Sequence, residues 1–247
     1  MRRAWWIIAA LLLAARPVAA AASLQGWAAV VISGDNEGAH VRSHTEAFDN
    51  ARRDLSRTFE RLGVSPANLA QFSVEPDRHP DAAPARLDDI ARTLRGLASR
   101  ARDGCLVYLT SHGSEDGAVL GDRLLAPAAL AGVVDGACGS RPSVVVVSAC
   151  YSGVFVPALA EPDRLVITAA RRDRSSFGCG ESDKYPFFDQ CVLESAAASP
   201  DFVVLGKKVR ACVARRERAE GMRPPSEPQI DVGARFHSPE FARRGGR

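Results

Sequence analysis

The sequence contains little lysine and has no large surplus of positive charge. Of its 247 residues 29 are arginine and only 3 are lysine, and these 32 basic residues face 29 acidic ones. A protein that binds nucleic acid needs an excess of cations to replace the counterions of the phosphates. The near balance argues against nucleic acid as a partner. We interpret the preference for arginine over lysine as compositional bias, with most arginines on solvated helix faces.

Long apolar segments are also scarce. After the N-terminal region, no stretch approaches the 18 consecutive apolar residues that indicate a membrane-spanning helix. The remaining composition is that of a globular protein, with 46% hydrophobic and 25% charged residues. These values exclude the disordered, collagen-like and coiled-coil classes. We therefore expect a soluble domain that is not stably inserted in a membrane.

Residues 1–22 have the order of a secretory signal peptide. Two arginines precede an apolar run of 12 residues, 4–15, and a stretch of small residues follows. This run is too short to span a bilayer, so we predict cleavage after Ala20 or Ala22 and an exported mature chain, periplasmic or secreted. An uncleaved anchor is the alternative. The segment holds three arginines and no acid, so the formal charge of +3 belongs to it and the rest of the chain balances at 29 against 29.

None of the six cysteines belongs to a C-x-x-C pair, and no histidine lies near any of them in the sequence. We therefore expect no zinc site on the cysteines, and we predict no metal and no organic cofactor. In an exported protein cysteines can form disulfides. If one thiol stays free for chemistry, at most two disulfides remain possible, and the sequence leaves their pairing open. Cys105 is expected in the core, and the other four are disulfide partners or core residues: Cys138, Cys179, Cys191 and Cys212.

Short apolar runs alternate with segments of helical periodicity along the chain. Strands are predicted at residues 27–33, 69–74, 105–110, 143–148 and 165–169, and helices at 43–62, 84–102, 126–134, 186–195 and 206–218. Strands that are apolar throughout and alternate with helices indicate a parallel sheet covered on both faces. We predict one α/β domain over residues 27–219, an α/β/α sandwich with a mostly parallel central sheet. The C-terminal extension, 220–247, is expected to wrap the surface or to be partly disordered.

Two reactive side chains come directly after predicted strands. His112 follows the strand at 105–110, and Cys150 follows the strand at 143–148. In an open parallel sheet the ligand site lies outside the carboxyl ends of the strands. A thiol has an unperturbed pKa of about 8.5, so a nucleophilic cysteine needs a nearby imidazole or helix N-terminus to favour the thiolate. The placement predicts Cys150 as a nucleophile with His112 as its base.

The backbone around these two residues predicts an oxyanion hole. A turn opens directly after Cys150, where N–H groups can point toward the site. Gly113 has no Cβ, so its N–H can approach a substrate carbonyl closely. Ser152 suggests a serine hydrolase as an alternative. Its neighbours, Cys-Tyr-Ser-Gly-Val, lack the G-x-S-x-G pattern of a nucleophile elbow.

Three motifs together resemble a known family. Ser-His-Gly at residues 111–113, Ala-Cys-Tyr-Ser-Gly at 149–153 and Arg-Asp-Arg-Ser-Ser-Phe at 172–177 each follow a predicted strand. Their order and spacing resemble the legumain-like cysteine peptidases of the caspase, gingipain and separase clan, which include the catalytic subunit of the glycosylphosphatidylinositol transamidase. The resemblance covers about residues 28–230 and is strongest to bacterial exported members. It implies a caspase-like fold and a cysteine endopeptidase that hydrolyses peptide bonds of a peptide or protein substrate through a thioester acyl-enzyme.

The resemblance also implies roles for individual residues. His112 would act as catalytic base and general acid, Cys150 as nucleophile, and the N–H groups of Gly113 and Cys150 as the oxyanion hole. Substrate-binding positions are implied at four residues: His44, Ser148, Ser175 and Ser176. His44 has an alternative interpretation, because Ser43 and Glu46 can form a capping box at a helix start.

The chain departs from the legumain pattern around the specificity pocket. Ser148 stands where legumain-type enzymes have an acid, Ser43 where they have arginine, and Ser111 where they have aspartate. Asp183 and Asp189 are both candidates for the pocket acid. These departures make strict cleavage after asparagine doubtful, and they leave two alternatives: an inactive member that acts as a binding module in the cell envelope, or a transamidase-like transpeptidase. Three further histidines are expected to be solvated: His40, His79 and His237. The sequence does not indicate an oligomeric state.

Overall fold

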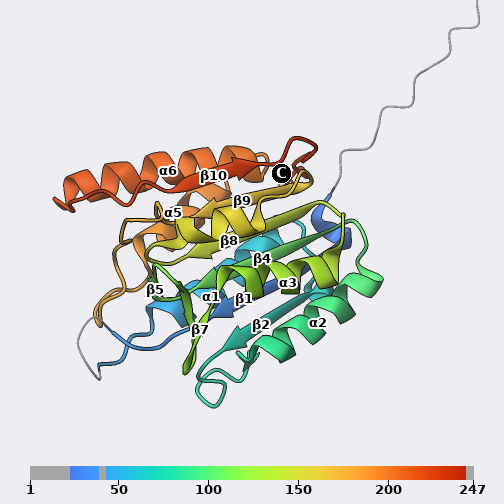
Figure 1. Cartoon of the computed structure of the whole chain (residues 1–247), viewed down its shortest axis with the longest axis horizontal. Coiled ribbons are helices and arrows are strands. Elements are labelled where there is room, and N and C mark those ends of the chain that lie inside the picture. Colours follow the sequence, from blue (N-terminus) through green and yellow to red (C-terminus); the bar gives the residue numbers. More distant parts are fainter. Residues whose placement is uncertain (1–22, 39–42, 243–247) are drawn as a thin grey trace, which may run out of the picture.

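The chain folds around one seven-stranded sheet with the strand order β10-β9-β8-β4-β1-β2-β3 (Figure 1). The computed structural model describes residues 23–38 and 43–242, so the predicted signal peptide and His40 lie outside the described residues. All neighbouring strands run parallel except β10, which is antiparallel to β9. The strands are β1 (Trp27–Ser33), β2 (Leu69–Ser73), β3 (Ala83–Pro84), β4 (Gly104–Thr110), β8 (Ser143–Ser148), β9 (Arg164–Thr168) and β10 (Gln229–Val232).

Helices cover both faces of the sheet, as the sequence predicts. One face carries α1 (Ala47–Arg61), α5 (Phe187–Ala196) and α6 (Phe202–Ala219), and the other carries α2 (Leu87–Arg100), α3 (Pro127–Cys138) and α4 (Val156–Leu159). Successive residues of a strand point to opposite faces, so β1 serves both cores: Trp27, Ala29 and Val31 join the first, and Ala28, Val30 and Ile32 join the second. Every residue of β1, β4 and β8 is buried, which explains why their sequences are apolar except at the strand ends.

A second, three-stranded antiparallel sheet follows β4. It consists of β5 (Gly113–Ser114), β6 (Gly117–Leu120) and β7 (Arg123–Leu125). The sequence indicated only a turn-rich stretch here. Two backbone hydrogen bonds connect this small sheet to the ends of β4 and β1. They run from Val119 N to His112 O (2.9 Å) and from Gly121 N to Gly34 O (2.9 Å). The small sheet thereby fixes the loops at the ends of β1 and β4. Three short 3-10 helices complete the elements: η1 (Leu24–Gly26), η2 (Pro66–Asn68) and η3 (Ser152–Phe155).

Several predicted boundaries are wrong, and each has a local reason. Helix α1 begins at Ala47 without a side-chain cap, so the capping box of Ser43 and Glu46 does not form. Helix α6 begins four residues earlier than predicted, because the Asp201 carboxylate accepts a hydrogen bond from Val204 N (2.9 Å). The chain after residue 219 was expected only to wrap the surface or to be partly disordered, yet it adds the edge strand β10 to the sheet.

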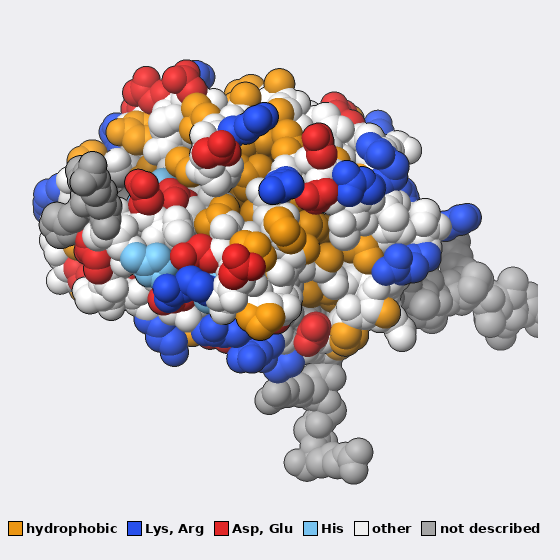
Figure 2. Space-filling model, turned by 90° about the horizontal axis from the view of Figure 1, so that it is seen from below, with side chains coloured by type: hydrophobic (Ala, Val, Ile, Leu, Met, Phe, Trp, Pro, Cys, Tyr) orange, Lys and Arg blue, Asp and Glu red, His pale blue; other side chains and the backbone are white. Residues whose placement is uncertain are grey.

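The surface mixes charges of both signs. On the face shown in Figure 2, acidic and basic side chains are interspersed with hydrophobic areas.

His79 was predicted to be solvated but is buried in the loop between β2 and β3. Among the described residues, no helix combines the length and the apolar character that a membrane crossing requires.

Two disulfides form, Cys105–Cys138 and Cys191–Cys212, and Cys150 and Cys179 remain free. Cys105 is buried as predicted, but it is also bonded, because α3 packs across β4 and brings Cys138 to it.

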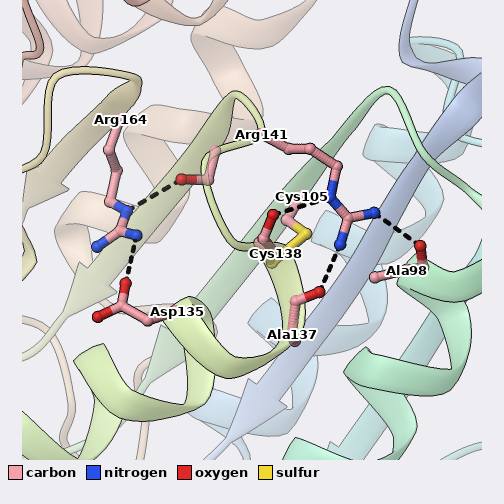
Figure 3. Close-up of a disulfide and its surroundings, with 8 residues drawn as sticks. Ala98, Cys105, Asp135, Ala137, Cys138, Arg141 and Arg164 are labelled. Atoms are coloured by element: carbon pink, nitrogen blue, oxygen red, sulfur yellow. Dashed lines mark hydrogen bonds and ion pairs between the residues drawn. A yellow bond between two sulfur atoms is a disulfide. The ribbon is translucent and has the colours of Figure 1, made fainter.

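Figure 3 shows that the disulfide lies beside Arg141, which donates hydrogen bonds to the carbonyls of Ala98, Ala137 and Cys138. These carbonyls belong to the last turns of α2 and α3, where backbone oxygens lack helical partners. One guanidinium therefore caps both helices next to the bond that ties α3 to the sheet.

Removing the Cys105–Cys138 bond should destabilise the fold. The bond closes a loop with a sequence separation of 33 residues, so in Cys105→Ala/Cys138→Ala the free energy of unfolding should fall by roughly 3 to 4 kcal/mol. Urea unfolding under non-reducing conditions measures this. Cys179→Ala, which removes a free thiol, is the matched control and should change stability by less than about 1 kcal/mol. A double variant as stable as the parent would contradict the prediction.

Candidate active site

The candidate site lies at the carboxyl ends of three neighbouring strands. In the register of the sheet, Ser33 of β1 pairs with Thr110 of β4, and Thr110 pairs with Ser148 of β8. Two residues beyond this row come three polar side chains: Asp35, His112 and Cys150. The sheet thus brings the two predicted catalytic residues to the same edge. It also adds Asp35, which the sequence reasoning missed, although Asp35 has the same offset from its strand.

Asp35 holds one nitrogen of the His112 ring. The distance from His112 Nδ1 to Asp35 Oδ2 is 2.8 Å, and Asp35 Oδ1 accepts hydrogen bonds from Asn36 N (2.8 Å) and Glu37 N (3.1 Å). Phe48 packs edge-on against the imidazole, with ring centroids 5.0 Å apart. The ring is therefore fixed on two sides. Because Nδ1 is taken by the carboxylate, Nε2 is the nitrogen left for chemistry.

The electrostatics of this pair favour an imidazolium. Burial would raise the pKa of Asp35, but hydrogen bonds from His112, Glu37 and Asn36 outweigh it and bring the pKa below its usual value. The hydrogen bond with Asp35 and an interaction with Cys179 raise the pKa of His112 to about 10, against the opposing effect of burial. At neutral pH the ring therefore carries a proton that it can donate.

Cys150 lies where β8 turns into η3. Tyr151, the next residue, has a left-handed backbone (φ 57°), and its N–H donates to Arg174 O (2.7 Å). The Sγ of Cys150 accepts a hydrogen bond from Ser176 N (3.2 Å) and lies 3.6 Å from Ser176 Oγ. Among the described residues, the hydrogen bonds of Cys150 Sγ run to Ser176 and none runs to His112. A backbone N–H that points at the sulfur stabilises a thiolate.

Gly113 sits against the backbone of the candidate nucleophile. A Cβ at this position would lie 2.3 Å from Cys150 O, so only glycine fits. This contact places the segments that carry His112 and Cys150 side by side. The backbone after His112 thereby packs directly against the backbone of Cys150.

Cys179 is a second free thiol near the base. It was expected to be a disulfide partner or a core residue, yet it is unbonded and half-buried in the loop between β9 and α5. Gly178 before it has a positive φ (85°), and a Cβ there would lie 2.4 Å from the Phe187 ring, so glycine is required for this turn. Nothing in the local sequence indicated that the turn would bring Cys179 to His112.

The predicted substrate-binding residues occupy different environments. Ser176 contacts Cys150 directly, and Ser175 is half-buried beside it in the same loop. His44 lies on the loop before α1, and its Nε2 is 2.7 Å from Glu75 Oε2. Ser148 is only 2% exposed and hydrogen bonds to Asp189, so it faces the interior of the domain and does not lie on an exposed surface.

Asp189 is a fully buried carboxylate behind the strand ends. It accepts hydrogen bonds from Tyr108 Oη (2.5 Å), Thr110 Oγ1 (2.5 Å) and Ser148. Burial raises its pKa to about 6, although these three donors oppose the shift. An acid at position 148 would place a second carboxylate beside Asp189. Ser148 instead supplies a hydroxyl that donates a hydrogen bond to Asp189. Asp183, the other candidate for a pocket acid, is half-buried and accepts from Gly180 N (2.8 Å).

Ser152 does not form a second nucleophile. Its side chain is fully buried, and its hydroxyl accepts a hydrogen bond from Ala170 N (3.1 Å). The residue thus joins the turn after Cys150 to the end of β9.

Two comparisons with known proteins bear on the fold and on the type of function. The sequence model of the peptidase C13 family, the legumain family, matches residues 87–201, a segment that contains His112, Cys150, Ser175 and Ser176. The crystal structure of caspase-1 from Spodoptera frugiperda superposes with a TM-score of 0.62 at 18% sequence identity, over 87% of this chain and 89% of that chain. The fold is therefore caspase-like, as predicted, and the family match supports a cysteine peptidase type of function. No curated protein matches the chain.

Replacing Asp35 should change the protonation of the base. In Asp35→Asn the charge that favours the imidazolium is lost, so the pKa of His112 should fall by roughly 1 to 3 units. Histidine side-chain NMR over a pH series measures this, with His112→Gln assigning the resonance. Asp183→Asn is the control and should leave the titration of His112 unchanged. An unaltered His112 pKa in Asp35→Asn would show that the pair is not coupled.

The buried Asp189 should make stability fall as pH rises. Its folded-state pKa (about 6) lies above the usual value of 3.8. The contribution of the protonated carboxyl to the free energy of unfolding is therefore fully present below the unfolded pKa and is lost as pH rises through about 6. Relative to Asp189→Asn, the parent should lose roughly 3 kcal/mol of unfolding free energy over this range. Urea unfolding at several pH values tests it. A difference between the two proteins that does not vary with pH would contradict the assignment.

Proposed function

We propose that this chain is a legumain-like cysteine endopeptidase that cleaves peptide or protein substrates through a thioester acyl-enzyme. The observation that carries the proposal is the common row of strand ends: Asp35, His112 and Cys150 each follow one register row of β1, β4 and β8 by two residues. Two of the three lie in the segment that the peptidase C13 model matches.

Acylation uses groups that already converge on this edge. The thiolate of Cys150 attacks the scissile carbonyl carbon, and the N–H groups of Gly113 and Cys150 stabilise the resulting oxyanion. His112 then donates its Nε2 proton to the leaving amine, the C–N bond breaks, and the acyl group remains on Sγ as a thioester. The high pKa of His112 suits this step, because the ring holds the proton until the amine needs it.

Deacylation reverses the roles. Neutral His112 takes a proton from a water molecule, the hydroxide oxygen attacks the thioester carbonyl, and the thiolate leaves as the product acid forms. The proton on the imidazole restores the starting state. Asp35 is a positioning residue in this scheme: it does not touch substrate, but its hydrogen bond to Nδ1 leaves Nε2 for the reaction and stabilises the imidazolium.

The loop at residues 171–186 would form one wall of the substrate cleft. Ser175 and Ser176 lie on it beside Cys150, and we assign them to substrate binding together with His44 on the opposite loop. Thr45 Oγ1 donates to Gly180 O (2.9 Å), which joins the two loops. Ser148 would act from the interior, by fixing Asp189 behind the site.

We place the mature protein outside the cytoplasm, periplasmic or secreted. Residues 1–22 have the pattern of an export signal, and the two disulfides are of the kind that persists in an oxidising compartment.

A site-selective labelling experiment tests the dyad. Iodoacetamide at neutral pH should label Cys150, and the rate should fall at least tenfold in His112→Ala, because the proposed dyad would lose the imidazolium charge that favours the thiolate. Peptide mapping by mass spectrometry separates Cys150 from the other free thiol, and Cys179→Ala should still be labelled at Cys150. Equal labelling of Cys150 with and without His112 would overturn the assignment.

A peptide-library digest then tests the activity itself. The parent should cleave peptides, and Cys150→Ala should not. If Cys150 is labelled but no peptide is cleaved, the protein is the inactive member that acts as a binding module. An added amine separates hydrolysis from transpeptidation: incorporation of the amine at the new C-terminus would show that the thioester is transferred as in the transamidase relatives.

A further inference from the structure

A cluster of ionisable side chains lies at the start of α1, outside the proposed dyad. The ligand atoms of Asp49, Glu75 and His79 are all within 4.8 Å of one another. Asp49 is in the first turn of α1, and the other two are on the loop between β2 and β3. Both Asp49 and His79 are buried, so the cluster is closed toward the interior and open on the side of Glu75.

His79 is the unusual member of this cluster. Its side chain is only 10% exposed, and its Nε2 makes no hydrogen bond with any described residue. The nitrogen lies 3.5 Å from Asp49 Oδ2 and 3.4 Å from Glu46 Oε2. These distances are too long for good N–H···O hydrogen bonds. They equal the roughly 3.4 Å that separates two ligand atoms around a tetrahedral ion with bonds of about 2.1 Å.

Asp49 is oriented as a metal ligand would be. Its Oδ1 accepts from Arg52 Nε (2.7 Å), which leaves Oδ2 on the side of His79. The hydroxyls of Ser73 (2.9 Å) and Ser33 (3.2 Å) contact Oδ2, and Ser33 also lies 3.4 Å from Asp35 O. Neighbours that hold a ligating carboxylate in one orientation are typical of metal sites.

The charge of the cluster matches a divalent cation. Among the described residues four carboxylates face two guanidinium groups, which is an excess of two negative charges when the imidazoles are neutral. The carboxylates are Glu46, Asp49, Glu75 and Asp81, and the guanidinium groups are Arg52 and Arg78. Asp49 is buried and paired with Arg52, and the excess lies on the more exposed carboxylates, where a local surplus of negative charge attracts a divalent cation.

We propose that His79, Asp49 and Glu75 bind a divalent transition-metal ion of the zinc type, with Glu46 within reach as a further ligand. An imidazole nitrogen combined with carboxylate oxygens favours zinc over calcium or magnesium, which prefer oxygen ligands alone. The ion would tie the first turn of α1 to the β2–β3 loop. Glu75 also holds His44, so the site would lie next to a residue that we assign to substrate binding.

Metal binding can be measured without reference to peptidase activity. The full-length Cys150→Ala/Cys179→Ala protein removes both free thiols, which would otherwise compete for zinc. Equilibrium dialysis with Zn²⁺ should give one bound ion per chain and a raised thermal midpoint. His79→Gln should weaken binding at least tenfold. His237→Gln changes an exposed histidine of the C-terminal segment and should bind like the parent. In the parent protein, which keeps its cysteines, Co²⁺ bound at this site should give no thiolate-to-cobalt charge-transfer band, because the proposed ligands include no cysteine.

Glu75→Gln provides a second variant if His79→Gln does not fold, as judged by circular dichroism without metal. It keeps the shape of the side chain and should also weaken Zn²⁺ binding. The proposal is wrong if both folded variants bind Zn²⁺ as the parent does, or if the parent binds no stoichiometric ion.

Discussion

The parallel register of β1, β4 and β8 is the constraint on which the rest of the site depends. Because Ser33, Thr110 and Ser148 share one row of the sheet, the polar residues that follow each strand emerge at the same edge. Asp189 holds this row from behind, since its buried carboxylate accepts hydrogen bonds from Tyr108, Thr110 and Ser148. Two neighbouring strands and α5 are thereby joined at the point where the chain leaves the sheet. A slip of one residue in either strand would break these bonds and turn the loops to the other face.

Two carboxylates near this row have opposite electrostatic roles. Asp35 accepts hydrogen bonds from a cationic ring and two backbone amides, so its pKa falls and the charge it keeps stabilises His112 as an imidazolium. Asp189 has only neutral hydroxyl partners in a fully buried position, so its pKa rises. The first arrangement suits acid–base chemistry at this edge of the sheet. The second is structural, because no described solvent-exposed group shares in it.

The backbone shapes the candidate active site as much as the side chains do. The contact of Gly113 with Cys150 O, the left-handed Tyr151 and the hydrogen bond from Ser176 N to Cys150 Sγ bring the loops after β4, β8 and β9 together at Cys150. The small sheet β5-β6-β7 keeps the first of these loops in place by bonding to His112 O and Gly34 O. The proposed metal site lies beyond His44, where the start of α1 meets the β2–β3 loop. It would join these two segments through a bound ion.

The sequence by itself determined the α/β class, the parallel sheet and the positions of His112, Gly113 and Cys150 at strand ends. Apolar runs and helical periodicity are local properties, and a strand end is visible wherever an apolar run stops. Only the tertiary structure decided the pairing of Asp35 with His112, the burial of Asp189 and His79, the two disulfides, and the approach of Cys179 to the base. These depend on which strands become neighbours and in what register, and on where a loop returns. Such contacts join residues far apart in the chain, and no local pattern of residues specifies them.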